Sequence, residues 1–228
     1  MTVSPPTDRI RERITTIQFS LPPQVRLIGV TKKMSISVIR AAYASGLREF
    51  GESRVQEAIA KQAELTDLEG VTWHLIGHLQ TNKVRKALLH FDWIHSVDSL
   101  RLAQKLNESA AELSCSPYCC LQVKMIPDLP KYGFELEALW QALPELNQLE
   151  HLKIVGLMTI PPLESSMAER QHLFKQASEL AIQINNREFD RLRITELSMG
   201  MSGDYQAAIA AGSTLIRLGT TLFGDRLA

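Results

Sequence analysis

The sequence contains little cysteine and no long hydrophobic run. Only three of its 228 residues are cysteines, an odd number with no Cys-x-x-Cys spacing, which argues against a disulfide framework and against a zinc site. Cys119 and Cys120 stand in an apolar run, so we expect them to pack as small hydrophobic residues. No apolar stretch approaches the roughly 20 residues that cross a bilayer. The sequence therefore indicates neither a disulfide-stabilised scaffold nor a membrane-spanning protein.

A net charge is also lacking, because 25 lysines and arginines balance 25 aspartates and glutamates. Without a basic excess, no electrostatic argument favours nucleic acid or an anionic membrane as the main partner. The longest basic cluster, Lys83, Arg85 and Lys86, is expected on the solvated face of a short helix. The first residues lack the apolar core of a signal peptide, so we expect a cytoplasmic protein.

Short apolar runs alternate with helical patterns along the chain. An N-terminal helix at Thr7–Gln18 and a proline-containing connector occupy residues 1–23. Eight runs then have the composition of buried strands, namely Val25–Lys32, Arg48–Phe50, Thr72–Ile76, Trp93–Val97, Tyr118–Val123, Lys153–Met158, Ile194–Leu197 and Thr214–Leu218. Helical patterns lie between them, and they include Ser35–Ala44, Arg54–Glu64, Leu100–Leu113, Leu136–Leu143, Met167–Ile184 and Tyr205–Ala211.

The eightfold repeat predicts a closed (β/α)8 barrel of the TIM type. No linker or low-complexity stretch divides the chain, so we expect residues 1–228 to form one domain. A doubly wound open sheet is the alternative, but the Gly-x-Gly-x-x-Gly turn typical of that fold does not follow the first strand.

The first predicted strand ends in two lysines at the edge where barrels carry their chemistry. Period-2 alternation places Ile28, Val30 and Lys32 on one face, so Lys32 is expected to be the last inward residue. A desolvated amine there loses its proton readily and can form a Schiff base with an aldehyde. Taken alone, a basic pair after a strand more often lies in solvent.

Glycines and hydroxyls follow the last two predicted strands. The loop after strand seven runs from Ser198 to Asp204, and Gly219-Thr220-Thr221 follows strand eight. N–H groups at a helix N-terminus suit a dianion, and barrels often build a phosphate site from these two loops. Either loop alone also fits an ordinary cap or turn.

Alternation along the eighth strand directs Arg217 into the barrel, near its top. A buried guanidinium needs acceptors. A carboxylate such as Asp98 or Glu52 is one candidate, and the pyridine nitrogen of a cofactor is the other. An amine at Lys32, a phosphate cradle and an inward arginine together describe a site for pyridoxal 5′-phosphate.

Six motifs make the similarity to one family specific. They are LIGVTK, REFGESRVQE, WHLIGHLQTNKV, HSVDSLRLAQKLN, GLMTIPP and ELSMGMSGDYQAAIAAGSTLIRLGTTLFG. In this order, from about residue 10 to the end, they resemble the YggS/PROSC family of pyridoxal phosphate homeostasis proteins. The resemblance implies a fold-type III barrel like the N-terminal domain of alanine racemase.

The resemblance also implies roles for individual residues. Lys32 would carry the Schiff base and Arg217 would face the pyridine nitrogen. The phosphate would be held by the loop that contains Ser198, Met199, Gly200 and Ser202, together with Gly219 and Thr220.

Two places depart from the family pattern. Ser53 stands where the family commonly has asparagine, so the resemblance implies a weaker or absent cofactor contact at this position. The loop Met125–Lys131 lacks the asparagines common in bacterial relatives, although Lys131 and Gly133 of a Lys-x-Gly pattern remain.

Other candidate sites are weaker. His74 and His78 are four residues apart, which suits a metal on a helix, but Thr72–Ile76 reads as a strand, so we predict no metal site. Glu135 and Glu137 are expected to be solvated or to cap a helix. No Gly-x-Ser-x-Gly elbow is present.

Three functions fit an inward lysine in such a barrel. A racemase or lyase would need a second base, which racemases of this fold take from an added domain and a partner subunit, and no such domain is expected here. An aldolase-like barrel would use Lys32 without a cofactor. We therefore expect a monomeric pyridoxal phosphate carrier without established turnover. It would act in the homeostasis of the cofactor and of amino and keto acids, with apo enzymes as candidate acceptors.

Overall fold

The fold is a closed ring of eight parallel strands, as the computed structural model shows for residues 6–126 and 132–224. Neighbouring strands pair in chain order, and β8 closes the ring on β1. The strands are β1 (Arg26–Val30), β2 (Glu49–Glu52), β3 (Thr72–Leu75), β4 (Trp93–Val97), β5 (Tyr118–Gln122), β6 (Lys153–Met158), β7 (Glu196–Ser198) and β8 (Leu215–Leu218). The predicted barrel is thus confirmed, and the open sheet is wrong.

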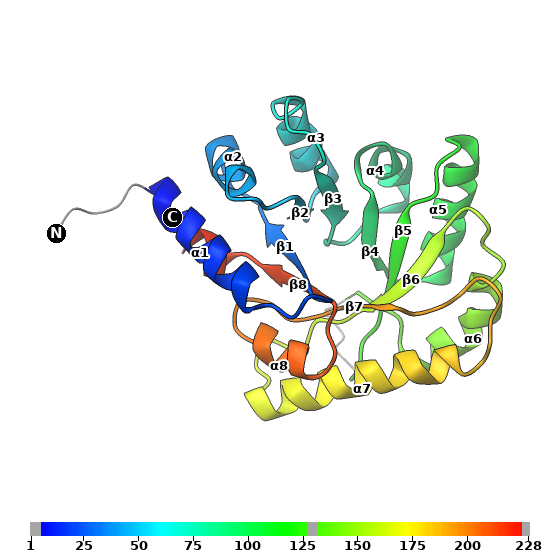
Figure 1. Ribbon diagram of the computed structural model, residues 1–228. Coiled ribbons are helices and arrows are strands. Elements are labelled where there is room, and N and C mark those ends of the chain that lie inside the picture. The colour runs from blue at the N-terminus through cyan, green and yellow to red at the C-terminus, as the bar shows by residue number, and fades with distance from the viewer. Residues whose placement is uncertain (1–5, 127–131, 225–228) are drawn as a thin grey trace.

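Helices surround the ring (Figure 1). They are α1 (Pro6–Ser20), α2 (Ile36–Ala44), α3 (Val55–Ala63), α4 (Val84–His90), α5 (Leu100–Glu112), α6 (Leu136–Leu146), α7 (Met167–Asn185), α8 (Tyr205–Ala210) and α9 (Thr220–Phe223), with a 3₁₀ turn η1 (Thr81–Lys83) before α4. Arg85 and Lys86 lie on the exposed face of α4, as predicted. Among the helices described, none has the length and apolar character that a bilayer crossing requires.

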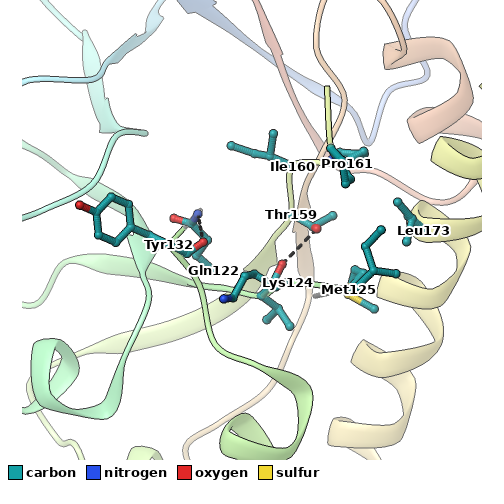
Figure 2. A pocket seen from close by; sticks show the side chains of 11 residues that line it. Gln122, Lys124, Met125, Tyr132, Thr159, Ile160, Pro161 and Leu173 are labelled. Atoms are coloured by element: carbon teal, nitrogen blue, oxygen red, sulfur yellow. Dashed lines mark hydrogen bonds between the residues drawn. The ribbon is translucent and has the colours of Figure 1, made fainter. Parts of the chain in front are cut away.

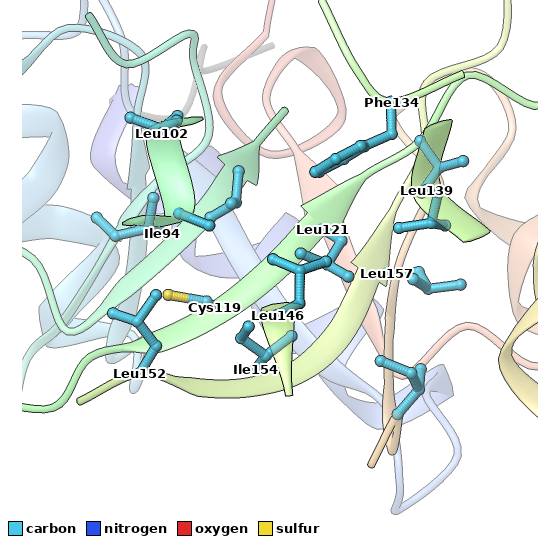
Figure 3. Packing of buried hydrophobic residues seen from close by; sticks show 14 of the residues in the cluster. Ile94, Leu102, Cys119, Leu121, Phe134, Leu139, Leu146, Leu152, Ile154 and Leu157 are labelled. Atoms are coloured by element: carbon cyan, nitrogen blue, oxygen red, sulfur yellow. The ribbon is translucent and has the colours of Figure 1, made fainter. Parts of the chain in front are cut away.

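Most of the apolar core lies between the strands and the helices. Figure 3 shows Ile94, Cys119 and Leu121 from neighbouring strands against Leu102 of α5 and Leu146 of α6. Cys119 and Cys120 are both fully buried, which confirms that they pack as small hydrophobic residues. Burial raises the pKa of the Cys119 thiol to about 12, so this thiol stays protonated and unreactive.

Several predicted boundaries differ from the observed ones, and at two of them the physical cause is clear. Strand β1 ends at Val30, not at Lys32, because the Met34 N–H bonds the Thr31 carbonyl at 2.9 Å and turns the chain toward α2. Helix α6 continues past Pro144 to Leu146, because Leu146 is buried in the outer core and holds the last turn in place.

The barrel interior combines a small apolar cluster, which includes Ile28, Cys120 and Met158, with a series of buried polar side chains. Arg26 Nε donates to Glu49 Oε1 at 2.9 Å, and Glu49 Oε2 lies 3.2 Å from His74 Nε2. His74 Nδ1 is 2.9 Å from His95 Nε2. Burial lowers the pKa of His74 and takes the pKa of His95 well below its usual value, with the neighbouring His74 adding to the effect. Both imidazoles are therefore neutral at pH 7.

These histidines predict a loss of stability in mild acid. Their folded-state pKa values lie below the ordinary value of about 6.5, so below that pH the unfolded chain binds more protons. The contribution of these histidines to the free energy of unfolding is fully present above about pH 6.5. It falls as the pH drops toward their folded-state pKa values, by up to about 1.4 kcal/mol per pH unit for each histidine.

Urea unfolding between pH 7.5 and 5 measures this slope. His95→Gln should reduce it, whereas His172→Gln, at an exposed position, should leave it unchanged. Equal slopes in all three proteins would show that the buried histidines do not control acid stability.

Candidate functional site

The predicted site residues meet at one rim of the barrel, because all C-terminal strand ends of a parallel ring lie on the same side. Lys32 follows β1 and is half-buried, whereas Lys33 is exposed. The Lys33 backbone has φ +62°, in the left-handed region. The chain therefore turns sharply after Lys32, and the two lysines have different surroundings even though β1 ends before them.

A buried ionic cluster holds the backbone on either side of Lys32. Lys61 Nζ donates to the Thr31 carbonyl at 2.7 Å, to Glu52 Oε1 at 2.8 Å and to Glu57 Oε1 at 2.7 Å. Thr31 Oγ1 donates to Glu52 Oε1 at 2.7 Å, and the Lys33 N–H donates to Glu57. One lysine thus ties the ends of β1 and β2 to helix α3.

The two carboxylates of this cluster differ in their pKa values. Burial raises the pKa of Glu52, and the bond from Lys61 offsets this only in part. At Glu57, burial is outweighed by the hydrogen bonds from Lys61 and the Lys33 backbone, so its pKa is lowered. Sequence analysis did not identify Lys61, and the i, i+4 spacing from Glu57 was the signal that could have found it.

Arg217 is buried inside the barrel, as predicted from alternation. Its Nη1 donates to Ser198 Oγ at 2.6 Å, and its Nη2 donates to the Thr159 carbonyl at 3.2 Å. Burial lowers the pKa of Arg217 to about 10, which still leaves it a cation at pH 7. The two bonds use two of five guanidinium N–H groups.

The carboxylate partners considered for Arg217 were wrong. Asp98 is 2.8 Å from His78 Nδ1, and Glu52 belongs to the Lys61 cluster. In the described part of the chain, Arg217 bonds neutral oxygens.

The loop after β7 has an inner and an outer part. The Ser198 hydroxyl points inward to Arg217 and His95, and the Met199 side chain packs in the outer core. Gly200 has φ +93°, and a Cβ on it would lie 2.6 Å from the Ala208 Cβ, so only glycine fits there. The side chains of Ser198 and Met199 therefore do not point toward the predicted phosphate cradle.

The outer part of the loop contacts the end of β8. Ser202 Oγ accepts the N–H groups of Gly219 at 3.3 Å and Thr221 at 3.2 Å. Asp204 is buried, accepts the Met201 N–H at 2.6 Å and pairs with Arg170 at 3.2 Å. The pairing with Arg170 offsets the negative charge of Asp204 beside the loop.

This cradle fits a phosphate group. Within residues 6–126 and 132–224, no protein acceptor is found for the N–H groups of Ser202 and Gly203. A Cβ on Gly219 would meet only Val30, at 3.7 Å, so the missing side chain leaves open space at the rim. Thr220 is exposed at the first position of α9. N–H groups, hydroxyls and open space in one place suit an anion.

A small cavity lies at the ends of β5 and β6 (Figure 2). Figure 2 shows Gln122, Lys124 and Tyr132 on one side and Thr159 and Ile160 on the other. The Thr159 carbonyl is the acceptor of Arg217, so the wall of the cavity continues to the arginine. The residues 127–131 of the loop flagged in the sequence, Lys131 included, lie outside the described residues.

Ser53, His74 and His78 were the other candidates from the sequence, and each has a defined position in the barrel. Ser53 packs its backbone against Gly77, where a Cβ would lie 2.3 Å from the Ser53 carbonyl oxygen. His74 is inside the barrel, whereas His78 is at the rim, stacked on Tyr132 with ring centroids 3.5 Å apart. The two histidines do not converge, and the described residues contain no group of three metal-ligating side chains.

The family model for the alanine racemase N-terminal domain matches residues 6–227. The pyridoxal phosphate homeostasis protein of Synechocystis sp. is 52% identical over 208 residues, which are 91% of this chain and 94% of that protein. That of Escherichia coli K12 is 37% identical over 207 residues, 90% of this chain and 87% of that protein.

Solved structures agree with these matches. PipY of Synechococcus elongatus with PLP bound has a TM-score of 0.91 and 54% identity, and covers 94% of this chain and 100% of its own. Alanine racemase of Clostridium difficile has a TM-score of 0.76 at 19% identity, and covers 97% of this chain and 58% of its own. The latter likeness is one of fold alone.

The Lys61 cluster predicts a large effect of one substitution. Lys61→Met leaves two carboxylates near one another without their cation, and we expect a loss of about 3–5 kcal/mol in the free energy of unfolding. The matched control is Lys105→Met, which removes an exposed ion pair with Glu108 and should cost less than about 1 kcal/mol.

Urea denaturation measures both variants. Adding Glu52→Gln to Lys61→Met should recover part of the loss, because a neutral amide replaces the buried carboxylate. Similar small losses for Lys61→Met and Lys105→Met would show that the cluster does not stabilise the rim.

Proposed function

The chain belongs to the family of pyridoxal phosphate homeostasis proteins, the YggS/PROSC family, and from this premise we propose that it binds pyridoxal 5′-phosphate at the C-terminal rim of its barrel. There it would serve the intracellular homeostasis of this cofactor and of amino and keto acids. The observation that carries the proposal is the convergence of a half-buried lysine, an open anion cradle and a buried arginine on one rim.

Each part of the rim has a distinct task in this proposal. Lys32 is the residue that attaches the cofactor, with its backbone held by the Lys61 cluster. The N–H groups of Ser202 and Gly203, with Gly219 and Thr220, receive the phosphate. Gly200 allows the positive φ of the loop, and Met199 anchors the loop by packing its side chain in the outer core.

The cofactor supplies an aldehyde that condenses reversibly with amines. Arg217 would face the ring nitrogen with the N–H groups that its bonds to Ser198 and Thr159 leave unused. Because Arg217 is a cation at pH 7, it opposes protonation of that nitrogen, and an unprotonated ring is a weak electron sink. This charge favours holding the cofactor over strong activation of a substrate carbon, which supports a carrier more than a racemase or lyase.

The racemase or lyase alternative requires a second proton acceptor. Among the described rim residues, His78 with its partner Asp98 has suitable chemistry, at a separation of 2.8 Å. Its stacking on Tyr132 holds the imidazole plane in place. The enzymatic alternative therefore has an identifiable residue on which to test it.

The proposal also covers the oligomeric state of the protein, its location and the acceptors of its cofactor. A closed barrel has no free sheet edge to pair with a second chain, which supports a monomer. The monomeric state, the cytoplasmic location and the transfer of cofactor to apo enzymes stay predictions.

Attachment at Lys32 predicts a specific chemical modification. Borohydride reduction of the loaded protein makes the lysine–cofactor bond permanent, and peptide mass mapping should find the pyridoxyl group on Lys32. Lys33→Met should label as well as the wild type, and Lys32→Met should not label. A pyridoxyl group on Lys33 would contradict the assignment.

The cradle predicts that two glycines respond differently to alanine. Gly219→Ala fits the fold without strain, so the melting temperature should stay within about 2 °C. Its methyl group enters the space proposed for phosphate, and affinity for pyridoxal 5′-phosphate should fall about tenfold or more, or about 1.4 kcal/mol. Gly200→Ala should instead destabilise the fold by about 1–3 kcal/mol, because of its positive φ.

Titrations with pyridoxal 5′-phosphate and with pyridoxal separate these effects. Pyridoxal lacks the phosphate, so its affinity should change little in Gly219→Ala. An equal loss for both compounds would place the phosphate elsewhere.

The carrier function predicts transfer without turnover. Loaded protein should give up its cofactor to hydroxylamine and restore activity to an apo aminotransferase. Incubation with L-alanine should yield no D-alanine above the cofactor-only control. Rapid racemisation that is lost in both Lys32→Met and His78→Gln would establish the enzymatic alternative.

A further inference from the structure

A line of polar contacts crosses the barrel interior beneath Arg217. The Arg217 Nη1 donates to Ser198 Oγ at 2.6 Å, and this oxygen lies 2.7 Å from His95 Nδ1. His95 Nε2 lies 2.9 Å from His74 Nδ1, and His74 Nε2 lies 3.2 Å from Glu49 Oε2. The five residues come from β8, β7, β4, β3 and β2, so the contacts join opposite sides of the ring.

The carboxylate end determines the direction of the contacts, because both imidazoles are neutral. Glu49 only accepts, so the proton of His74 is on Nε2, and His74 Nδ1 accepts from His95 Nε2. His95 Nδ1 then has no proton and accepts the hydroxyl proton of Ser198. Arg217 only donates, and Ser198 Oγ accepts from it as well.

The last contact is the weakest of the line. Its geometry falls short of a good hydrogen bond, and within the described residues neither His74 Nε2 nor Glu49 Oε2 has another hydrogen-bond partner. His74 Nε2 and Glu49 Oε2 nevertheless lie within ion-pair distance of each other. The Glu49 side chain is also fixed by Arg26, because Glu49 Oε1 accepts a hydrogen bond from Arg26 Nε.

Burial isolates the line from water. His74, His95 and Ser198 have no exposed surface, and Arg217 is 3% exposed. A group that loses its partner here cannot turn to solvent, so each member depends on the next. Only the Glu49 end reaches solvent, with its side chain 21% exposed.

We propose that Ser198, His95 and His74 form one directional hydrogen-bond chain that orients Arg217 from beneath, and that the Glu49 carboxylate at ion-pair distance from His74 sets its direction. In this chain Ser198 and His95 are positioning residues for the arginine, and they do not themselves contact the reacting atoms. The existence of this hydrogen-bond chain does not depend on the proposed function. Only its effect on the cofactor rests on that function. Through Arg217, it sets how the guanidinium meets the ring nitrogen of bound pyridoxal 5′-phosphate.

The first experiment uses cofactor-free protein labelled with 15N-histidine. Two-bond 1H–15N correlation spectra report which imidazole nitrogen carries the proton. At pH 7.5 both His74 and His95 should be neutral with the proton on Nε2. A proton on Nδ1 of either residue, or a charged imidazolium, would overturn the proposed direction.

The second experiment measures the cofactor's response. His95→Phe and Ser198→Ala remove a link, and pyridoxal 5′-phosphate bound to them should show a shifted visible absorption maximum and about 2- to 10-fold weaker affinity. His95→Asn places an acceptor near the Nδ1 position and should recover most of the wild-type spectrum. Ser96→Ala, a buried neighbour that bonds the Gly77 carbonyl, is the matched control and should behave as wild type.

The outcomes separate the two proposals. If wild-type protein fails to bind pyridoxal 5′-phosphate, the proposed function is wrong. The tautomers of His74 and His95 in the cofactor-free protein still test the hydrogen-bond chain. If the tautomers agree but Ser198→Ala and His95→Phe leave the spectrum and affinity unchanged, the chain does not position Arg217. Ser198→Ala is a small change and serves as the reference should His95→Phe fail to fold.

Discussion

The pairing of β1 with β8 is the contact on which the site depends. It closes the ring and sets Ile28 opposite Arg217 and Gly29 opposite Leu218. Lys32 and Gly219 thereby lie just beyond paired strand ends, although they are near opposite ends of the chain. An open sheet of the same strands would separate the proposed attachment lysine from the anion cradle, so barrel closure is a condition for the function as well as for the fold.

Buried charge is concentrated where the site needs fixed geometry. Lys61 secures the turn that contains Lys32, and the polar line through His95 reaches Arg217. Buried polar groups of this kind seldom increase net stability over an apolar core, but they hold one arrangement once every member is satisfied. We infer that the barrel accepts polar groups in its interior because they orient the two functional side chains at the rim.

The fold alone does not decide between carrier and enzyme. The alanine racemase of Clostridium difficile shares the barrel at 19% identity, and this chain covers 58% of its length. Function must therefore be argued from the site. The cation at Arg217 and the open space at Gly219 support reversible holding of a phosphorylated aldehyde, and they are features of side chains and loops that a shared fold does not dictate.

The sequence by itself determined the eight strands, the inward direction of Arg217 and the glycine-containing loops, because these follow from local periodicity and from residue types that suit only certain backbone shapes. Tertiary structure alone decided which partners the polar groups take. Lys61 lies on the helix after β2 and reaches the end of β1, and the Ser198 hydroxyl turns inward to His95 across the barrel instead of toward phosphate. Local sequence patterns do not encode such choices, because each acceptor is selected by the packing of segments far apart in the chain.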